Sequence, residues 1–86
     1  MSSIYSEEYQ RVIRLLRETR LEKGITQEKL AQAFGRPQSF IAKVENGERR
    51  LDVVEFVHMA GLLSLNPAQI LDKIKLKKPS LNSNLK

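Results

Sequence analysis

The sequence contains no cysteine and no tryptophan among its 86 residues. Without cysteine, the chain forms no disulfide bond, carries out no thiol chemistry and binds no cysteine-ligated zinc, which fits a reducing cytoplasm. No apolar run approaches the roughly 18 residues that a membrane-spanning helix requires. The first ten residues, MSSIYSEEYQ, are polar and acidic, so we expect no signal peptide there. We therefore expect a cytoplasmic protein.

The chain is also poor in the groups that catalytic and cofactor sites require. Its four glycines are dispersed, so none of them builds a phosphate-binding glycine loop. Its single histidine, His58, is predicted on the outer side of a helix, without a nucleophile or a second ligand beside it. The carboxylates are scattered along the chain. We expect no enzymatic activity, no metal and no cofactor.

The composition favours one small helical domain. Hydrophobic residues make up 41% of the chain and aromatic residues 6%, so the core should be mainly aliphatic. The formal net charge is +5, but three of the five excess positive charges lie in residues 76–86. Net charge is therefore weak support for a nucleic-acid partner. The placement of Arg36, Lys43, Arg49 and Arg50 around one predicted helix is better support.

The stretch TQEKLAQAFGRPQSFIAKVENG, from Thr26 to Gly47, predicts two short amphipathic helices with one tight break. Thr26 is a favourable N-cap, Gly35 suits a left-handed residue after the first helix, and Pro37 can open the second. Only Gly35 and Arg36 separate the two helices, so they must cross sharply. This pattern is typical of a helix-turn-helix, and an ordinary αα-hairpin in a bundle is the alternative.

Three further helices follow from capping signals and apolar spacing. The first starts after Ser6 and runs to about Glu22, the fourth starts after Asp52, and the fifth starts at Asn66-Pro67 and ends near residue 75. The fourth helix is expected to bury Val53, Phe56, Val57, Ala60 and Leu63. The predicted fold is all-α, a compact five-helix bundle. We expect residues 1–5 to form a frayed N-terminus, 6–75 the domain and 76–86 a disordered basic tail.

These residues resemble a known family. The chain is similar to the phage repressor and Cro-type helix-turn-helix family, also called the xenobiotic-response-element type, over roughly residues 16–71. The matching residues are Thr26-Gln27, Leu30-Ala31, Gly35, Gln38-Ser39, Ile41 and Glu45-Asn46-Gly47. The resemblance implies a bacterial or phage-encoded transcriptional regulator that binds double-stranded DNA, such as a Cro repressor or a restriction–modification controller protein.

The resemblance also implies roles for single residues of the recognition helix, about Pro37–Asn46, and its surroundings. The expected base-reading residues are Gln38, Ser39 and Lys43, and the expected phosphate-binding residues are Gln27, Arg36, Asn46 and Arg49. The Gln38 amide can pair with N6 and N7 of adenine, and Lys43 can donate to guanine or to a phosphate. Two places stay open for Phe40: the edge of the core, or contact with thymine methyl groups.

Arg20 and Glu45 match family positions that form an ion pair. A bidentate, partly buried pair would fix the recognition helix against the first helix. The alternative is two solvated charges that contribute little.

The expected assembly is a symmetric homodimer on a roughly palindromic operator. A surplus of apolar residues places its interface at Leu62, Leu65, Ile70 and Ile74. Two alternatives remain: Ile70 and Ile74 complete the core of the single chain, or the interface lies on the N-terminal helix through Tyr5 and Tyr9. The alternative function is a protein-interaction module, such as an antitoxin whose DNA binding is autoregulatory.

Overall fold

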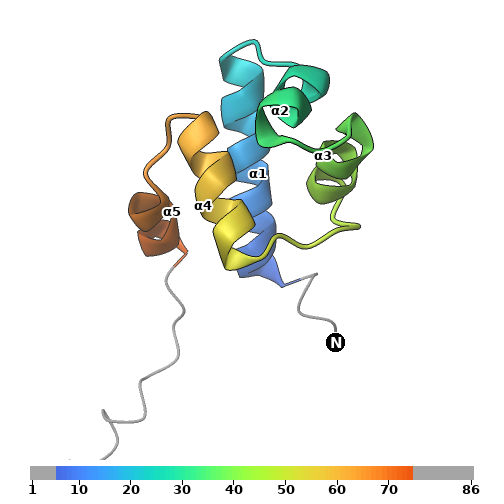
Figure 1. Cartoon of the computed structure of the whole chain (residues 1–86). Coiled ribbons are helices and arrows are strands. Elements are labelled where there is room, and N and C mark those ends of the chain that lie inside the picture. Colours follow the sequence, from blue (N-terminus) through green and yellow to red (C-terminus); the bar gives the residue numbers. More distant parts are fainter. Residues whose placement is uncertain (1–5, 75–86) are drawn as a thin grey trace, which may run out of the picture.

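Five helices make up the described part of the chain, residues 6–74 of the computed structural model (Figure 1). In chain order they are α1 (Glu7–Glu22), α2 (Gln27–Phe34), α3 (Gln38–Glu45), α4 (Val53–Leu62) and α5 (Pro67–Lys73). No strand occurs between residues 6 and 74. The prediction of an all-α fold with five helices is confirmed. The predicted frayed end, 1–5, and the predicted tail, 76–86, lie outside the described residues.

Side-chain caps fix where four of the helices begin. Ser6, Thr26, Asp52 and Asn66 each accept a hydrogen bond from a backbone N–H of the first turn that follows. In α4 the cap is a full capping box, because Glu55 also accepts from the Asp52 backbone N–H, at 3.0 Å. Pro37 differs slightly from its prediction. It is the N-cap of α3, with φ −64° and ψ 155°, and does not lie in the first turn.

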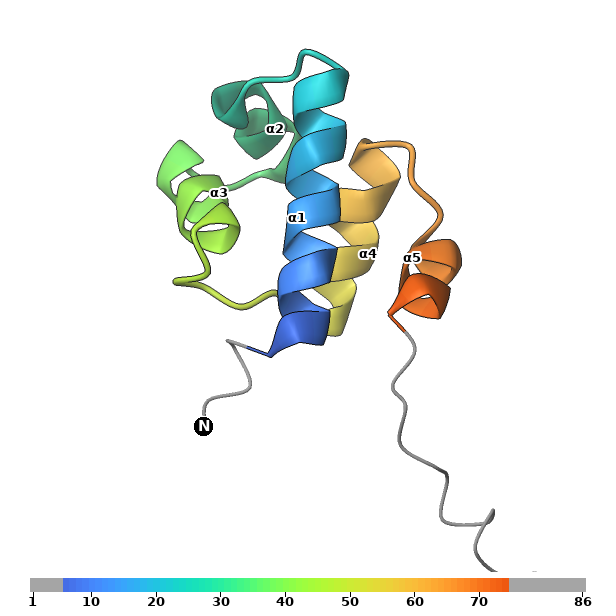
Figure 2. The same ribbon diagram turned by 180° about the vertical axis from the view of Figure 1, so that it is seen from behind.

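The core lies where α1, α2, α3 and α4 meet, and it is mainly aliphatic as predicted. Ile41 and Val44 of α3 and Leu63 after α4 are almost completely buried. Both views of the ribbon show α1 and α4 side by side, with α3 on one side of this pair and α5 on the other (Figures 1 and 2). The face of α3 that looks away from the core is therefore remote from α5. None of the described helices is long and apolar enough to cross a membrane.

The predicted core face of α4 is partly wrong. Phe56, Ala60 and Leu63 are buried, but Val53 is 78% exposed and Val57 is 49% exposed. Met59, which the sequence prediction omitted, is 2% exposed. Phe56, Met59, Ala60 and Leu63 follow the spacing of one helical stripe, whereas Val53 and Val57 form a second stripe about 100° away. The helix therefore carries more apolar surface than the core of the single chain covers.

Candidate nucleic-acid interface

The turn between α2 and α3 presents α3 to solvent. Gly35 closes α2 in the left-handed conformation, with φ 88°, and its N–H and that of Arg36 both donate to the Ala31 carbonyl, at 2.8 and 3.1 Å. Ala31 is 2% exposed and small enough for the two helices to cross closely. Leu30 and Ala31 of α2 together with Ile41 and Val44 of α3 bury the inner faces of the two helices. The outer face of α3 is left uncovered.

A buried ion pair fastens the C-terminal end of α3 to α1. Arg20 and Glu45 bind in bidentate fashion, with Nε–Oε2 at 2.7 Å and Nη2–Oε1 at 2.9 Å. Each side chain is only 6% exposed. The third guanidinium nitrogen, Nη1, donates to the Ile25 carbonyl at 2.7 Å. The sequence prediction paired these two residues, and the structure brings them together. All three guanidinium nitrogens of Arg20 donate hydrogen bonds.

The ion pair continues as a chain of hydrogen bonds to the start of α3. Gln27 Nε2 donates to Glu45 Oε1 at 2.9 Å, and Gln38 Nε2 donates to Gln27 Oε1 at 2.7 Å. An amide NH₂ carries two hydrogens, so Gln38 keeps one N–H and its carbonyl oxygen for another partner. The prediction assigned Gln27 to a phosphate and did not foresee this link. The link depends on how α2 and α3 cross, which sequence spacing does not specify.

The other residues of α3 that were predicted to contact DNA are all accessible to solvent. Ser39 and Lys43 are exposed on the helix, and Asn46 is exposed at its C-cap. Together with Gln38 they form a polar, partly cationic outer face on a helix whose inner face is apolar. Such a helix has the shape and the side chains to enter a major groove.

A cluster of charged and aromatic side chains adjoins this face. Arg36 and Arg49 both donate to the Glu55 carboxylate, at 3.1 Å and 3.0 Å to Oε2. Both guanidinium carbons lie over the Phe40 ring, 4.5 and 5.0 Å from its centroid. Phe40 itself is 7% exposed and stacks on Phe34, with ring centroids 5.3 Å apart. Phe40 is therefore a core residue whose outer side supports two arginines, and it does not extend toward a base.

Glu55 is ionised in this cluster at neutral pH. The hydrogen bond from the Asp52 backbone N–H lowers the pKa of Glu55, against the opposing effect of burial. The guanidinium groups of Arg49 and Arg36 lower the pKa further. The predicted phosphate contacts Arg36 and Arg49 are therefore not isolated cations, because they share one carboxylate.

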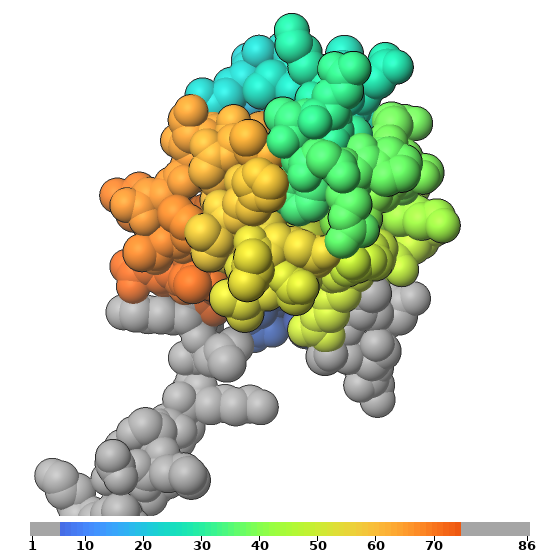
Figure 3. Space-filling view, in the orientation of Figure 1, coloured from blue at the N-terminus to red at the C-terminus, as the bar shows by residue number. Residues whose placement is uncertain are grey.

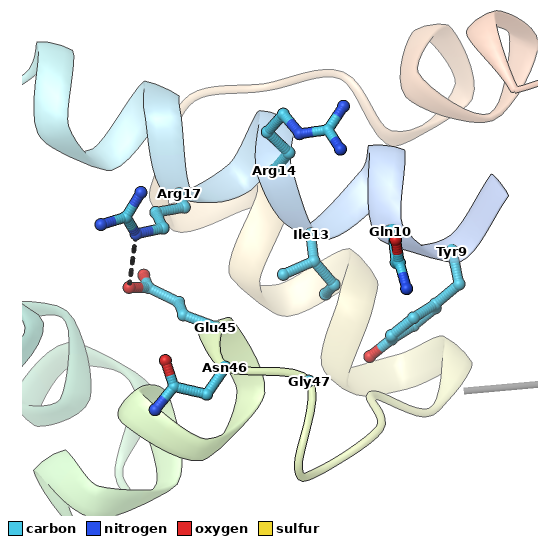
Figure 4. A pocket seen from close by; sticks show the side chains of 8 residues that line it. All are labelled: Tyr9, Gln10, Ile13, Arg14, Arg17, Glu45, Asn46 and Gly47. Carbon is cyan, nitrogen blue, oxygen red and sulfur yellow. Dashed lines mark ion pairs between the residues drawn. The ribbon is translucent and has the colours of Figure 1, made fainter. Parts of the chain in front are cut away.

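An open pocket of about 500 Å³ separates α1 from the C-terminal end of α3 (Figure 4). Arg14 and Arg17 of α1 line it together with Glu45, Asn46 and Gly47. Arg17 is half-exposed and lies 3.8 Å from Glu45. The sequence prediction missed these two arginines, although arginine recurs at every third position from 11 to 20, which places part of the cationic face of α1 beside α3.

An apolar groove of about 380 Å³ lies between the start of α1, the first half of α4 and α5; its lining includes Tyr9, Val12, Val53, Val57, Leu71 and Ile74. Val53, Val57 and Leu71 are among the most exposed large apolar side chains, at 78%, 49% and 52%. The predicted dimer residues lie differently. Ile70 is buried in the core at 3% exposure, so it offers no surface to a partner, and Leu62, Leu65 and Ile74 are partly buried against that core.

Other kinds of site have little support in the described residues. Within residues 6–74, no group of three His, Asp or Glu side chains is arranged to hold a metal ion. His58 is exposed, as predicted, and stacks on Phe34 with ring centroids 4.6 Å apart.

Comparison with known proteins agrees with this geometry. The model of the Helix-turn-helix family matches residues 16–70, well over half of the chain. A solved structure, an XRE-family like protein from Pseudomonas syringae pv. tomato str. DC3000, superposes with a TM-score of 0.75 and is 46% identical, covering 84% of this chain and 88% of its own. No curated protein matches significantly. The chain belongs to the Cro/XRE-type helix-turn-helix family of DNA-binding transcription regulators.

Proposed function

We propose that the chain is a sequence-specific regulator that docks α3 in the major groove of a roughly palindromic operator as a homodimer. The observation that carries this proposal is the state of Gln38. Its side chain is exposed at the start of α3, yet it is oriented through Gln27 by the buried Arg20–Glu45 pair. A polar side chain held in place at the surface of a helix is pre-organised for recognition.

Adenine is the base that fits Gln38. With one N–H given to Gln27, the amide retains one donor for adenine N7 and one acceptor for the adenine N6 amino group. The contact with Gln27 therefore orients the amide without consuming the two groups that adenine requires. Ser39 and Lys43, exposed on the same helix, are the proposed neighbouring base contacts.

The proposed phosphate contacts surround α3. Arg36 and Arg49 would bind the DNA phosphate backbone on the α4 side of α3, and Asn46 would bind it at the C-terminal end of α3. Gln27, at the N-terminus of α2, uses its remaining N–H for a phosphate, where the helix dipole also favours an anion. These contacts position α3 and read no sequence themselves.

The homodimer is proposed to form through the apolar groove. This revises the predicted interface, because Ile70 is buried, whereas Val53, Val57 and Leu71 are exposed and adjacent to Ile74. Concentrated exposed apolar surface marks a partner site. Since α5 lies on the other side of the α1–α4 pair from α3 (Figures 1 and 2), dimerisation there leaves both recognition helices free.

Selection of bound duplexes from a random DNA pool tests the proposal. The expected product is an inverted repeat whose half-site centres lie one helical turn, about 34 Å, apart. A pool in which no sequence is enriched would contradict sequence-specific binding. Enrichment of a single unrepeated site would contradict the dimer while leaving the reading helix intact.

The exposed apolar groove also favours a second candidate, a module that binds a different protein, such as an antitoxin. Sedimentation of the purified chain separates the two functions. A dimer in solution supports self-association, whereas a monomer at high micromolar concentration would leave the groove for a different partner.

A further inference from the structure

Glu55 joins the two segments that flank α3. Arg36 lies in the turn before α3 and Arg49 in the loop after it. Both side chains donate hydrogen bonds to the Glu55 carboxylate. The first residues of α4 adjoin both segments on the face shown in Figure 3. The Glu55 side chain is 12% exposed, whereas Arg36 and Arg49 are 44% and 39% exposed. The carboxylate is therefore covered, and the cations point to solvent.

Phe40 restricts the orientation of both arginines. Their guanidinium carbons lie 4.5 and 5.0 Å from the centroid of one ring, which is itself buried and stacked on Phe34. Each guanidinium group is thus held by a carboxylate and by an aromatic face. Arg49 also donates to the Arg50 carbonyl. Free surface arginines sample many rotamers, whereas these two have few left to lose on binding.

The charges of the cluster do not balance. Two arginines share one carboxylate, so one positive charge stays uncompensated beside α3. Non-specific DNA binding depends on the number of phosphates that a protein neutralises, because each neutralised phosphate releases condensed counterions. A carboxylate among the phosphate-binding arginines lowers that number.

We infer that Glu55 is a positioning residue that limits non-specific DNA binding, because it offsets one arginine charge and holds both guanidinium groups in the register of a correctly docked operator. The inference rests on the proposed DNA-binding function. On the operator the fixed geometry compensates for the lost charge, since both arginines meet phosphates without reorganising. On random DNA the phosphates do not match the fixed positions of the two arginines, so only the reduced positive charge affects the affinity.

The test is Glu55→Gln. Glutamine keeps an acceptor for the Asp52 backbone N–H and is favourable at the third position of a capping box, so the start of α4 is retained. Binding is measured by fluorescence anisotropy on the selected operator and on a random duplex over a series of salt concentrations. For the random duplex, the slope of log K against log salt should become steeper by about 0.9, the value for one additional phosphate. Random-duplex affinity should rise roughly threefold or more at moderate salt, and operator affinity should rise less.

Asp52→Asn is the matched control. It removes the same unit of charge from the same turn of α4, and asparagine remains a good N-cap. The Asp52 carboxylate accepts from the Glu55 backbone N–H and takes no part in the Arg36 and Arg49 contacts described above. Its salt slope should change by less than half as much as that of Glu55→Gln. In a chain that carries Arg36→Gln and Arg49→Gln, adding Glu55→Gln should leave the slope unchanged.

Circular dichroism and thermal melts verify that each variant is folded. A steeper slope for Glu55→Gln alone, lost when both arginines are replaced, supports the inference. Equal slopes for the wild type and Glu55→Gln, or equal steepening by Asp52→Asn, would overturn it. Absence of any DNA binding by the wild type would instead refute the proposed function, so the two failures are distinguishable.

Discussion

At the scale of single residues, the outer face of α3 is connected to the core by side-chain hydrogen bonds. This series of hydrogen bonds starts at the buried Arg20–Glu45 pair and continues through Gln27 to Gln38, with donor–acceptor distances of 2.7 to 2.9 Å. The proposed base-reading residue Gln38 is thus oriented by side chains to which no base contact is assigned. Mutations along this chain should affect recognition and stability in different proportions.

Gln27→Ala should remove the orienting contact of Gln38. Because the Gln38 amide can then rotate, operator binding should weaken by about 1 kcal/mol, the usual value of one hydrogen bond. Random duplexes should lose less, since they do not use the oriented amide. Anisotropy titrations on both DNAs measure the difference, with Gln32→Ala on the exposed side of α2 as the control. Equal losses on both DNAs would mean that Gln27 acts only as a phosphate contact.

Arg20→Ala and Glu45→Ala should each destabilise the fold strongly. Glu45→Ala leaves the buried Arg20 charge unpaired, and Arg20→Ala leaves Glu45 with only the half-exposed Arg17, 3.8 Å away; breaking a buried pair costs about 3–5 kcal/mol. The double variant should lose less than the sum of the two single losses, because no charge is then left unpaired. Chemical denaturation of the three variants determines the coupling. Small, additive losses would show that the pair contributes little.

At the scale of elements, helix ends were predictable and helix faces were less so. Ser6, Thr26, Asp52 and Asn66 cap their helices as predicted, because a cap is a contact between residues two or three apart. The face of α4 was wrong at Val53 and Val57, since two apolar stripes on one helix have the same periodicity and only the packing decides between them. In the candidate site, too, local features were predictable and contacts that depend on packing were not.

The exposed positions of the polar residues on α3 could be predicted from the sequence, whereas the hydrogen-bond partners of the site residues could not. Gln38, Ser39 and Lys43 are exposed where the motif places them. The Gln27–Gln38 contact and the shared carboxylate of Glu55 each join different elements, at separations of 11 residues or, for Arg36, 19. Such contacts are set by the crossing of helices and by side-chain rotamers.

Two glycines should respond to alanine with opposite signs. Gly35 adopts φ 88° at the end of α2, so Gly35→Ala should destabilise the fold by about 1 kcal/mol through backbone strain. Gly61 lies within α4 and an added Cβ meets nothing within 4 Å, so Gly61→Ala should stabilise by about 0.5–1 kcal/mol. Chemical denaturation of both variants measures the difference. A change of the same sign in both would contradict the assigned backbone roles.

At the scale of the whole molecule, polar and apolar functions lie on different sides. The outer face of α3 is polar and cationic, while the apolar groove lies against α5, across the α1–α4 pair. This separation permits DNA binding and self-association at the same time. In the proposed two-fold dimer, the two copies of α3 would reach successive major grooves.

Leu71→Lys should convert the proposed dimer to a monomer, because the interface would then have to bury a charged ammonium group in place of an apolar side chain. Leu21→Lys is the control, since Leu21 and Leu71 have the same exposed fraction, 52%, and Leu21 lies on α1 outside the groove. Sedimentation equilibrium measures both variants. If Leu71→Lys remains as dimeric as the control, the interface lies elsewhere.

The recognition of adenine by Gln38 is the central claim, and single-atom substitution of the operator tests it most directly. Each adenine of the selected site is replaced in turn by 7-deazaadenine, which lacks the N7 acceptor, and affinity is measured for the wild type and for Gln38→Ala. The wild type should lose about 1–3 kcal/mol at one adenine in each half-site, and Gln38→Ala should bind the substituted and unsubstituted sites equally. Full sensitivity of Gln38→Ala at every adenine to which the wild type responds would contradict the claim.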